Sequence, residues 1–240
     1  RGLMVRPAWE GGGGPPLFIA IPTKGPVDPE WALNFAFLVQ RCPRPTAISM
    51  VSAPAVDYAR NELVENFLRT PCEWMLWLDT DVMPPVDAFE KLSKTNFLIV
   101  SALYRARNVW FASQSEWPVV AGRFTRQVID GKENLVVQEY SRGWDPGEII
   151  PIDAAGFGCV LIHRKVFEAL DPPWFNYTMR YKWRKGTEWE REDWISEDWY
   201  FFKKVKDAGF KVVLNTTVEC THITSVKITG DGKVAQAGFK

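Results

Sequence analysis

The chain has 240 residues, in which 29 lysines and arginines balance 29 aspartates and glutamates. The formal net charge is therefore zero, so no global field favours a polyanionic partner, and a basic nucleic-acid-binding protein is disfavoured. With 46% hydrophobic and 24% charged residues, the chain can bury a full core and is neither disordered nor fibrous. Its apolar stretches fall short of the roughly 20 residues that cross a bilayer, so we expect a soluble, cytoplasmic protein.

The four cysteines are widely spaced and form no CxxC pair. This spacing predicts neither a zinc knuckle nor a redox motif, and we expect buried thiols. Residues 1–16 end in four glycines and two prolines, which predicts a flexible N-terminal arm. Residues 17–240 are then expected to form a single domain.

The first half of the domain alternates strands and helices. The expected order is a strand over 17–21 that ends at Pro22, a helix capped by Asp28, a strand over 46–51, a helix over 57–69 and a strand over 74–78. This order predicts an α/β fold with parallel pairing and right-handed crossovers. Ligands of such sheets bind beyond the carboxyl ends of the strands. No glycine-rich dinucleotide motif or P-loop follows the first strand.

The second half is less regular and predicts antiparallel additions to a mixed sheet. Further strands are expected over 97–104, 110–112, 119–124, 135–140, 158–163, 211–214 and 217–220. Helices are expected over 164–170 and 196–208, and a terminal hairpin turn over 230–232. Residues 171–196 show no period and predict a long loop, whose Trp183 and Trp189 are candidates for a lid over a ligand.

Two carboxylates follow the buried strand that ends at Leu78. In an extended segment Asp79 and Asp81 would point the same way and face one ligand. Two like charges held together need a cation, and hard carboxylate oxygens suit Mg²⁺ or Mn²⁺ bridging to phosphate. The alternative interpretation is that Asp79 caps the turn while Asp81 is solvated.

Further chemistry-bearing residues lie late in the chain. Glu197 and Asp198 open the last predicted helix, where acids complement the helix dipole. One of them could instead face the cleft as a general base for an acceptor hydroxyl. His222 lies beyond a strand end, where an imidazole could complete a metal site, although a lone histidine is more often structural.

Several short segments resemble the GT-A glycosyltransferases, especially the glycosyltransferase family 2 group. The matching segments, in the family's order, are 19–23, 59–61, 76–81, 155–158, 196–198, 209–210 and 220–222. The resemblance implies a GT-A fold, a Rossmann-like mixed sheet flanked by helices. It also implies a nucleotide-binding half over 17–104, and an acceptor half with a C-terminal hairpin over 105–240.

The resemblance further implies a metal-dependent transfer of sugar from a nucleoside-diphosphate-sugar to the hydroxyl of a carbohydrate or other acceptor. An acceptor deprotonated by Asp198 would attack from the opposite face and give inversion. Retaining enzymes share the fold and the metal site, so the sequence leaves both stereochemical outcomes open. Asp79, Asp81 and His222 would hold Mn²⁺ or Mg²⁺, and Asp198 would be the catalytic base with Glu197 beside it. The residues that would contact the nucleotide-sugar are Pro22, Thr23, Arg60, Asp79 and Gly156.

Two other functions use the same fold. A sugar-phosphate nucleotidyltransferase shares the parallel sheet and the acidic metal site, but it needs a glycine-rich basic loop after the first strand, of which residues 22–25 supply little. A non-catalytic carbohydrate-binding domain would keep the exposed aromatics, but the intact acids and His222 argue against it.

Overall fold

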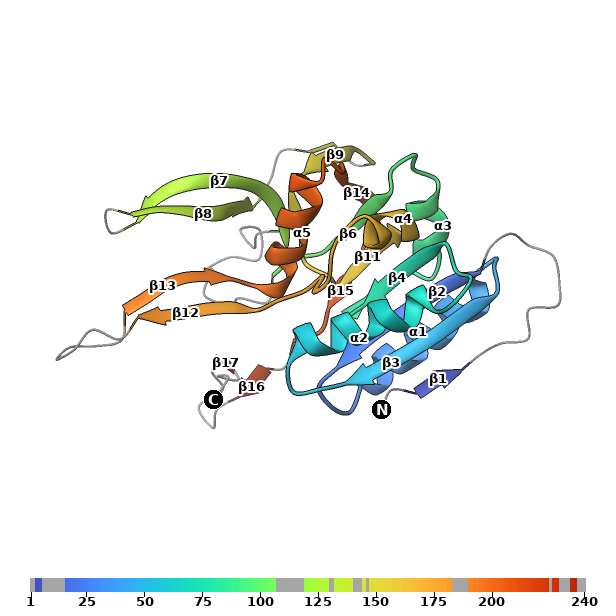
Figure 1. Cartoon of the computed structure of the whole chain (residues 1–240). Helices are drawn as coiled ribbons and strands as arrows, with labels where there is room; N and C mark the ends of the chain where they lie inside the picture. The colour runs from blue at the N-terminus through green and yellow to red at the C-terminus, as the bar shows by residue number, and fades with distance from the viewer. Residues whose placement is uncertain are drawn as a thin grey trace.

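The computed structural model describes residues 3–5, 16–106, 119–129, 132–139, 144–145, 147–182, 190–224, 226–228 and 234–236. Within them, eight strands form a central mixed sheet in the order β1-β3-β2-β4-β11-β6-β14-β9 (Figure 1). In that order the strands are β1 (Leu3–Val5), β3 (Thr46–Ser52), β2 (Leu17–Thr23), β4 (Trp74–Leu78), β11 (Cys159–His163), β6 (Ile99–Leu103), β14 (Val212–Glu219) and β9 (Ile149–Ile152). The expected parallel pairing holds for β2 with β3 and β4 and for β14 with β6, and the other neighbours are antiparallel.

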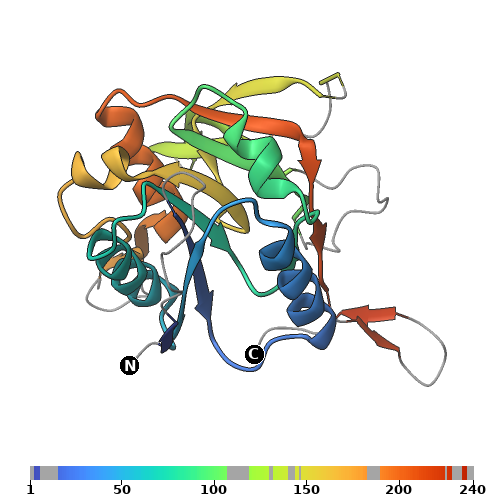
Figure 2. The same ribbon diagram turned by 90° about the vertical axis from the view of Figure 1, so that its right-hand side faces the viewer.

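Helices cover both faces of this sheet (Figure 2). They are α1 (Pro29–Arg41), α2 (Val56–Leu68), α3 (Ala88–Ser93), α4 (Arg164–Glu168) and α5 (Glu197–Asp207). Side chains alternate along β2, so Leu17, Ile19 and Ile21 join one core with α1 and α3, whereas Phe18 and Ala20 join a second core with α2, α4 and α5. The sheet is therefore buried on both faces, as a parallel α/β sheet requires.

Strand β2 continues past Pro22, although the sequence predicted that it would end there. Backbone groups of a parallel strand point alternately to its two neighbours, and Leu17 donates to the carbonyl of Pro45 on the β3 side. Pro22 therefore faces the β4 side, where pairing stops at Ala20. The missing N–H removes no ladder hydrogen bond, so the strand extends to Thr23.

Several segments differ from the sequence-based expectation. Helix α3 and strand β9 were not predicted at all. Residues 3–5, expected in the arm, pair with β3 as an edge strand. The loop expected over 171–196 contains β12 (Thr178–Lys182) and β13 (Glu190–Ile195), which pair as a hairpin. That hairpin projects from the sheet in Figure 1. Strand β13 opens with four consecutive charged residues, a composition that does not predict a strand. The two strands expected over 211–220 are one strand, β14, interrupted by a register shift after Asn215.

The remaining strands form small satellite sheets. They are β7 (Ala121–Ile129), β8 (Lys132–Glu139) and β10 (Ala154–Ala155), then β5 (Val82–Met83) with β15 (Thr221–His222), and β16 (Val226–Ile228) with β17 (Val234–Gln236). The last pair confirms the expected terminal hairpin. The strand expected over 110–112 lies outside the described residues. In the described part of the chain, no helix is both long and apolar enough to span a membrane.

The N-terminus of α1 allows a test of the predicted helix cap. Asp28 Oδ1 accepts hydrogen bonds from the backbone N–H groups of Glu30 (2.8 Å) and Trp31 (3.4 Å). We predict that Asp28→Ala lowers the free energy of unfolding by about 1 kcal/mol, whereas Asp28→Asn, which keeps a capping oxygen, lowers it by much less. Urea denaturation measures both values, and equal losses for the two variants would contradict the cap.

Candidate active site

The segment after β4 is a turn, so the extended geometry that would point Asp79 and Asp81 the same way does not hold. The N–H of Val82 donates to the carbonyl of Asp79 (3.2 Å), and the indole Nε1 of Trp31 donates to the carbonyls of both residues, at 3.0 Å each. The N–H of Asp79 donates to the carbonyl of Gly158 (3.1 Å). The turn is thus held by α1 on one side and by the start of β11 on the other. Because it is not extended, Asp79 and Asp81 face different neighbours.

Asp81 lies beside His222, although the two residues are far apart in the chain. Strand β15 pairs with β5, and the N–H of Ile223 donates to the carbonyl of Asp81 (2.7 Å). This pairing brings His222 Nε2 to 3.8 Å from Asp81 Oδ1. His222 Nδ1 lies 2.7 Å from the carbonyl oxygen of Arg105, which can only accept, so Nδ1 carries the proton. In the neutral imidazole, Nε2 is then the nitrogen with a free lone pair, and it faces the carboxylate.

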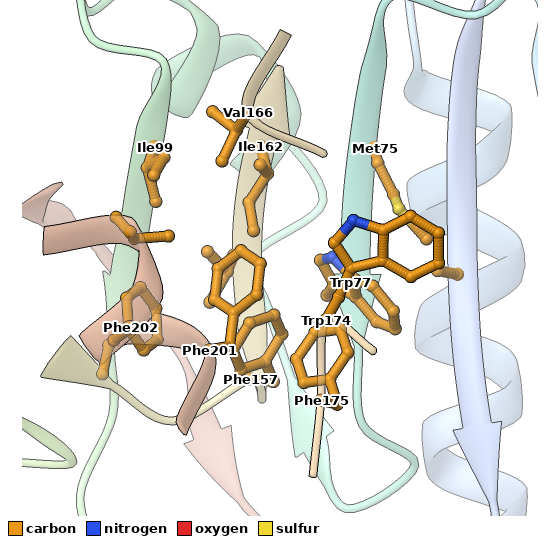
Figure 3. Close-up of a cluster of buried hydrophobic side chains, with 14 of the residues drawn as sticks. Met75, Trp77, Ile99, Phe157, Ile162, Val166, Trp174, Phe175, Phe201 and Phe202 are labelled. Atoms are coloured by element: carbon orange, nitrogen blue, oxygen red, sulfur yellow. The ribbon is translucent and has the colours of Figure 1, made fainter. Parts of the chain in front are cut away.

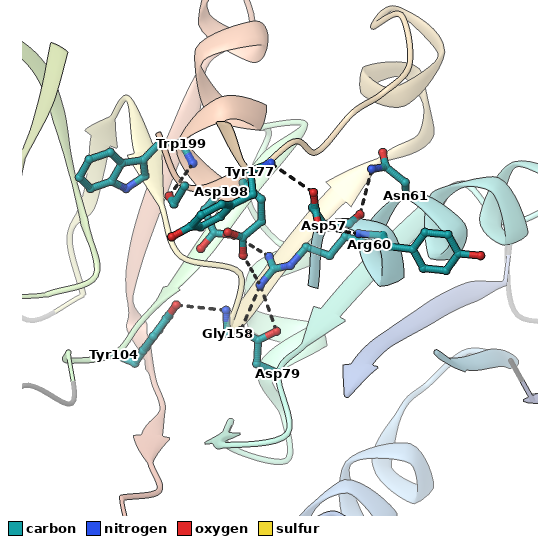
Figure 4. Close-up of polar contacts among 12 residues, drawn as sticks. Asp57, Arg60, Asn61, Asp79, Tyr104, Gly158, Tyr177, Asp198 and Trp199 are labelled. Atoms are coloured by element: carbon teal, nitrogen blue, oxygen red, sulfur yellow. Dashed lines mark hydrogen bonds and ion pairs between the residues drawn. The ribbon is translucent and has the colours of Figure 1, made fainter. Parts of the chain in front are cut away.

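Asp79 belongs instead to a buried cluster centred on Arg60 of α2 (Figure 4). The guanidinium, whose side chain is 3% exposed, lies 2.7 Å from Asp198 Oδ1, 3.4 Å from Asp79 Oδ2 and 3.6 Å from Glu197 Oε1. One cation thus faces three carboxylates, an excess of two negative charges when all are ionised. Within the described residues, Arg60 Nε is buried without a hydrogen-bond partner, and Arg60 Nη1 and Asp198 Oδ1 meet as an ion pair without the geometry of a hydrogen bond.

Burial and mutual repulsion set the protonation of this cluster. Burial raises the pKa of Asp198 well above its usual range, Glu197 and Asp79 raise it further, and Arg60 only partly opposes them. Burial also raises the pKa of Asp79, again against Arg60. For Arg60, burial disfavours the charged form, but the three carboxylates outweigh it and raise the pKa above the ordinary value. A proton or a bound cation would relieve the excess charge.

Aromatic rings form the floor beneath Arg60. The guanidinium lies 4.7 Å from the ring centre of Phe157 and 5.7 Å from that of Phe175, within the range of a cation–π contact. Phe157 and Phe175 pack edge to face with each other and with Trp77 (Figure 3). Asn61, next to Arg60, accepts from the N–H of Phe175 and donates to its carbonyl. The apolar floor lowers the local dielectric and strengthens every charge interaction above it.

The first turn of α5 presents two of the acids. Ser196 caps the helix, its Oγ accepting from the N–H of Trp199 (3.4 Å). Glu197 and Asp198 follow in the first turn, where the helix dipole favours carboxylates. Their side chains are 10% and 21% exposed. A favourable position in the first turn and a place in the cluster are therefore compatible, because both acids have both.

The residues expected to contact a nucleotide lie in different settings. Pro22 and Thr23 are buried at the end of β2, and the Thr23 hydroxyl closes a small turn with Gly25. Gly156 is also buried, and a Cβ atom there would overlap the hydroxyl oxygen of Tyr104. The guanidinium of Arg60, which was expected to contact the nucleotide, lies instead among the three carboxylates of the cluster. The lid candidates Trp183 and Trp189 lie outside the described residues.

Two residues at the site escaped the sequence analysis. Tyr104 directly follows β6, and its hydroxyl accepts from the N–H of Gly158 (3.1 Å). The rule that ligands bind beyond the carboxyl ends of strands could have found it. The second residue is Trp31 of α1. Nothing in its local sequence indicates the two hydrogen bonds that it donates to the turn 48 and 51 positions away.

The donor set at Asp81 and His222 fits a divalent cation in part. A carboxylate oxygen and an imidazole nitrogen both bind Mn²⁺, and a carbonyl at the far ring nitrogen orients metal-ligating histidines. Among the described residues, no group of three or more His, Cys, Asp or Glu could hold a metal ion. Mg²⁺ commonly keeps one or two protein carboxylates and takes its other ligands from phosphate and water. The pair, together with the negative cluster, suits that mode of binding.

The Arg60 cluster yields a stability prediction. Arg60→Met leaves three carboxylates without a cation, so we expect the free energy of unfolding to fall by about 3 to 5 kcal/mol at neutral pH. Adding Asp198→Asn should restore part of it. The loss should shrink in acid, because protonation removes the unpaired charge. Arg69→Met, at an exposed ion pair with Glu65 of the same helix, should cost at most about 1 kcal/mol. Equal losses for Arg60→Met and Arg69→Met in denaturant titrations would contradict this assignment.

Comparisons with known proteins place the fold. The sequence matches no protein-family model and no curated protein. The solved structure of A197 from STIV is similar, with a TM-score of 0.57 at 16% identity over 95% of this chain and 98% of that chain. GalNAc-T7, solved with UDP, GalNAc and Mn²⁺, gives 0.50 at 10% identity over 87% of this chain and 43% of that chain. The catalytic domain of Drosophila beta1,4galactosyltransferase 7, solved with xylobiose, gives 0.47 at 13% identity, over 88% and 72% of the two chains. The chain therefore has the GT-A-like fold that its sequence predicted.

Proposed function

We propose that the protein is a metal-dependent glycosyltransferase that moves a sugar from a nucleoside-diphosphate-sugar to an acceptor hydroxyl. The observation that carries the proposal is the buried cluster of Arg60 with three carboxylates, next to the Asp81–His222 pair. Both lie where strands of the sheet end, which is where α/β folds bind ligands. The fold and the sequence resemblance support the same reaction class.

Asp81 and His222 are the proposed holders of Mn²⁺ or Mg²⁺, with Asp79 near enough to contribute through its charge. When bound, such a cation stabilises the negative charge that develops on a leaving diphosphate. The carboxylates of the site repel a diphosphate that binds without a cation. Binding of donor and cation should therefore be coupled, each favouring the other.

Asp198 is the proposed base. Its raised pKa brings a carboxyl closer to the operating pH, which favours transfer of a proton from an acceptor hydroxyl. Its side chain is 21% exposed, so a hydroxyl can reach it. Attack from the face opposite the leaving diphosphate would invert the anomeric centre. Glu197, which is more buried, would instead tune the charge around Asp198.

Arg60 would control the charge of the base. Its Nη1 lies 2.7 Å from Asp198 Oδ1, and a paired carboxylate is a weaker base than a free one. A donor phosphate offers the guanidinium stronger, bidentate partners. The nucleotide contact predicted from the sequence and the acid cluster are thus two states of one residue, and donor binding would release Asp198 for catalysis.

The first test is the metal requirement. Incubating the protein with a panel of nucleotide-sugars and Mn²⁺ should release nucleoside diphosphate from one of them, and EDTA should abolish the release. Asp81→Asn should lose most of this activity while unfolding at nearly the wild-type temperature. Full turnover in EDTA would sink the metal assignment, and exchange of diphosphate into the donor would instead indicate a nucleotidyltransferase.

The second test separates the two acids of α5. Asp198→Asn should lower kcat by about 10² to 10⁴-fold with little change in donor affinity, the usual signature of a lost base. Glu197→Gln should be milder. The comparison requires turnover measured with acceptor and donor affinity measured without it. A loss of donor binding in Asp198→Asn as large as the loss of kcat would assign Asp198 to donor positioning.

A further inference from the structure

Tyr104 lies between the two parts of the candidate site. It follows β6, is 5% exposed, and points from below toward Gly158 in Figure 4. Its ring packs edge to face on the imidazole of His222, with ring centres 5.5 Å apart and planes at 81°. The charges of Asp79, Asp198 and Arg60 all act on its hydroxyl.

At one end, the ring of Tyr104 and the neighbouring carbonyl together hold His222. The carbonyl of Arg105 accepts from Nδ1 and fixes the tautomer, while the ring edge of Tyr104 fixes the plane of the imidazole. Two consecutive residues therefore determine where Nε2 points. That nitrogen faces Asp81 Oδ1 at 3.8 Å.

At the other end, the hydroxyl of Tyr104 reaches the turn that carries Asp79. It accepts from the N–H of Gly158, whose carbonyl accepts from the N–H of Asp79. Two glycines make room for it: a Cβ at Gly156 would overlap the hydroxyl, and a Cβ at Gly158 would lie 2.8 Å from Tyr104 Cζ. The absence of side chains at Gly156 and Gly158 thus leaves the space that the Tyr104 hydroxyl occupies.

We propose that Tyr104 is the positioning residue of the candidate metal pair, its ring orienting His222 and its hydroxyl fixing the backbone that carries Asp79. The metal part rests on the proposed function, but the orientation of His222 does not. Residues that orient a metal-binding histidine typically change metal affinity 10- to 100-fold when they are removed.

The experiment compares Tyr104→Leu, which removes ring and hydroxyl, with Tyr104→Phe, which keeps the ring. Nitrogen-15 spectra of the metal-free protein report the tautomers of its two histidines. His222 should be protonated at Nδ1. His163 is an internal reference of the opposite tautomer, because its Nδ1 accepts from the N–H of Lys165. In Tyr104→Leu the imidazole can rotate away from the carbonyl of Arg105, so the His222 tautomers should mix while the His163 signal is unchanged. Tyr104→Phe, which keeps the ring, should preserve both signals.

Mn²⁺ binding, measured by paramagnetic resonance of the free ion, is the second readout. Tyr104→Leu should weaken it at least tenfold and Tyr104→Phe by less, whereas Tyr58→Leu, at an exposed tyrosine of α2, should not change it. If Tyr104→Leu fails to fold, Tyr104→Met replaces it, with similar volume and no ring. A folded ringless variant with wild-type His222 signals and Mn²⁺ affinity would overturn the proposal. Absence of Mn²⁺ binding by the wild type would overturn the metal part, and with it the proposed function, while the tautomer result would still decide the positioning.

Discussion

The candidate site depends on one interaction, the contact of a single buried guanidinium with three carboxylates. Arg60 comes from α2, Asp79 from the turn after β4, and Glu197 and Asp198 from the first turn of α5. Desolvating these charges is costly, and one cation cannot neutralise three anions. The folded protein therefore holds an excess of negative charge where the central strands end. That excess is the physical reason for expecting a cationic ligand there.

The surrounding structure holds this unfavourable arrangement in place. Trp31 of α1 pins the turn of Asp79, and the aromatic floor of Phe157 and Phe175 supports the guanidinium from below. The N-terminus of α5 offsets part of the repulsion through its dipole. Both hydrophobic cores thus contribute to one site. Such over-determination is typical of functional sites, where stability is given up for a preset geometry.

Local sequence patterns predicted the first half of the fold well. The caps and apolar runs around α1, β3, α2 and β4 are set by neighbouring residues, so periodicity finds them. The projecting hairpin β12–β13 was missed because β13 opens with four consecutive charged residues, which are typical of loops rather than strands. At the site, the sequence pointed to Arg60, Asp79, Asp198 and His222. It did not predict the contact between Arg60 and the acids. That contact depends on how α2 and α5 pack on the sheet, which no local pattern encodes.

The most direct test of this account is a crystal structure of the protein grown with Mn²⁺ and a nucleoside diphosphate, with data collected at the manganese absorption edge. The account predicts an anomalous peak within bonding distance of Asp81 and His222, with Arg60 turned from Asp198 toward the diphosphate. A diphosphate bound at these strand ends without a manganese peak, or a peak remote from both side chains, would contradict the account.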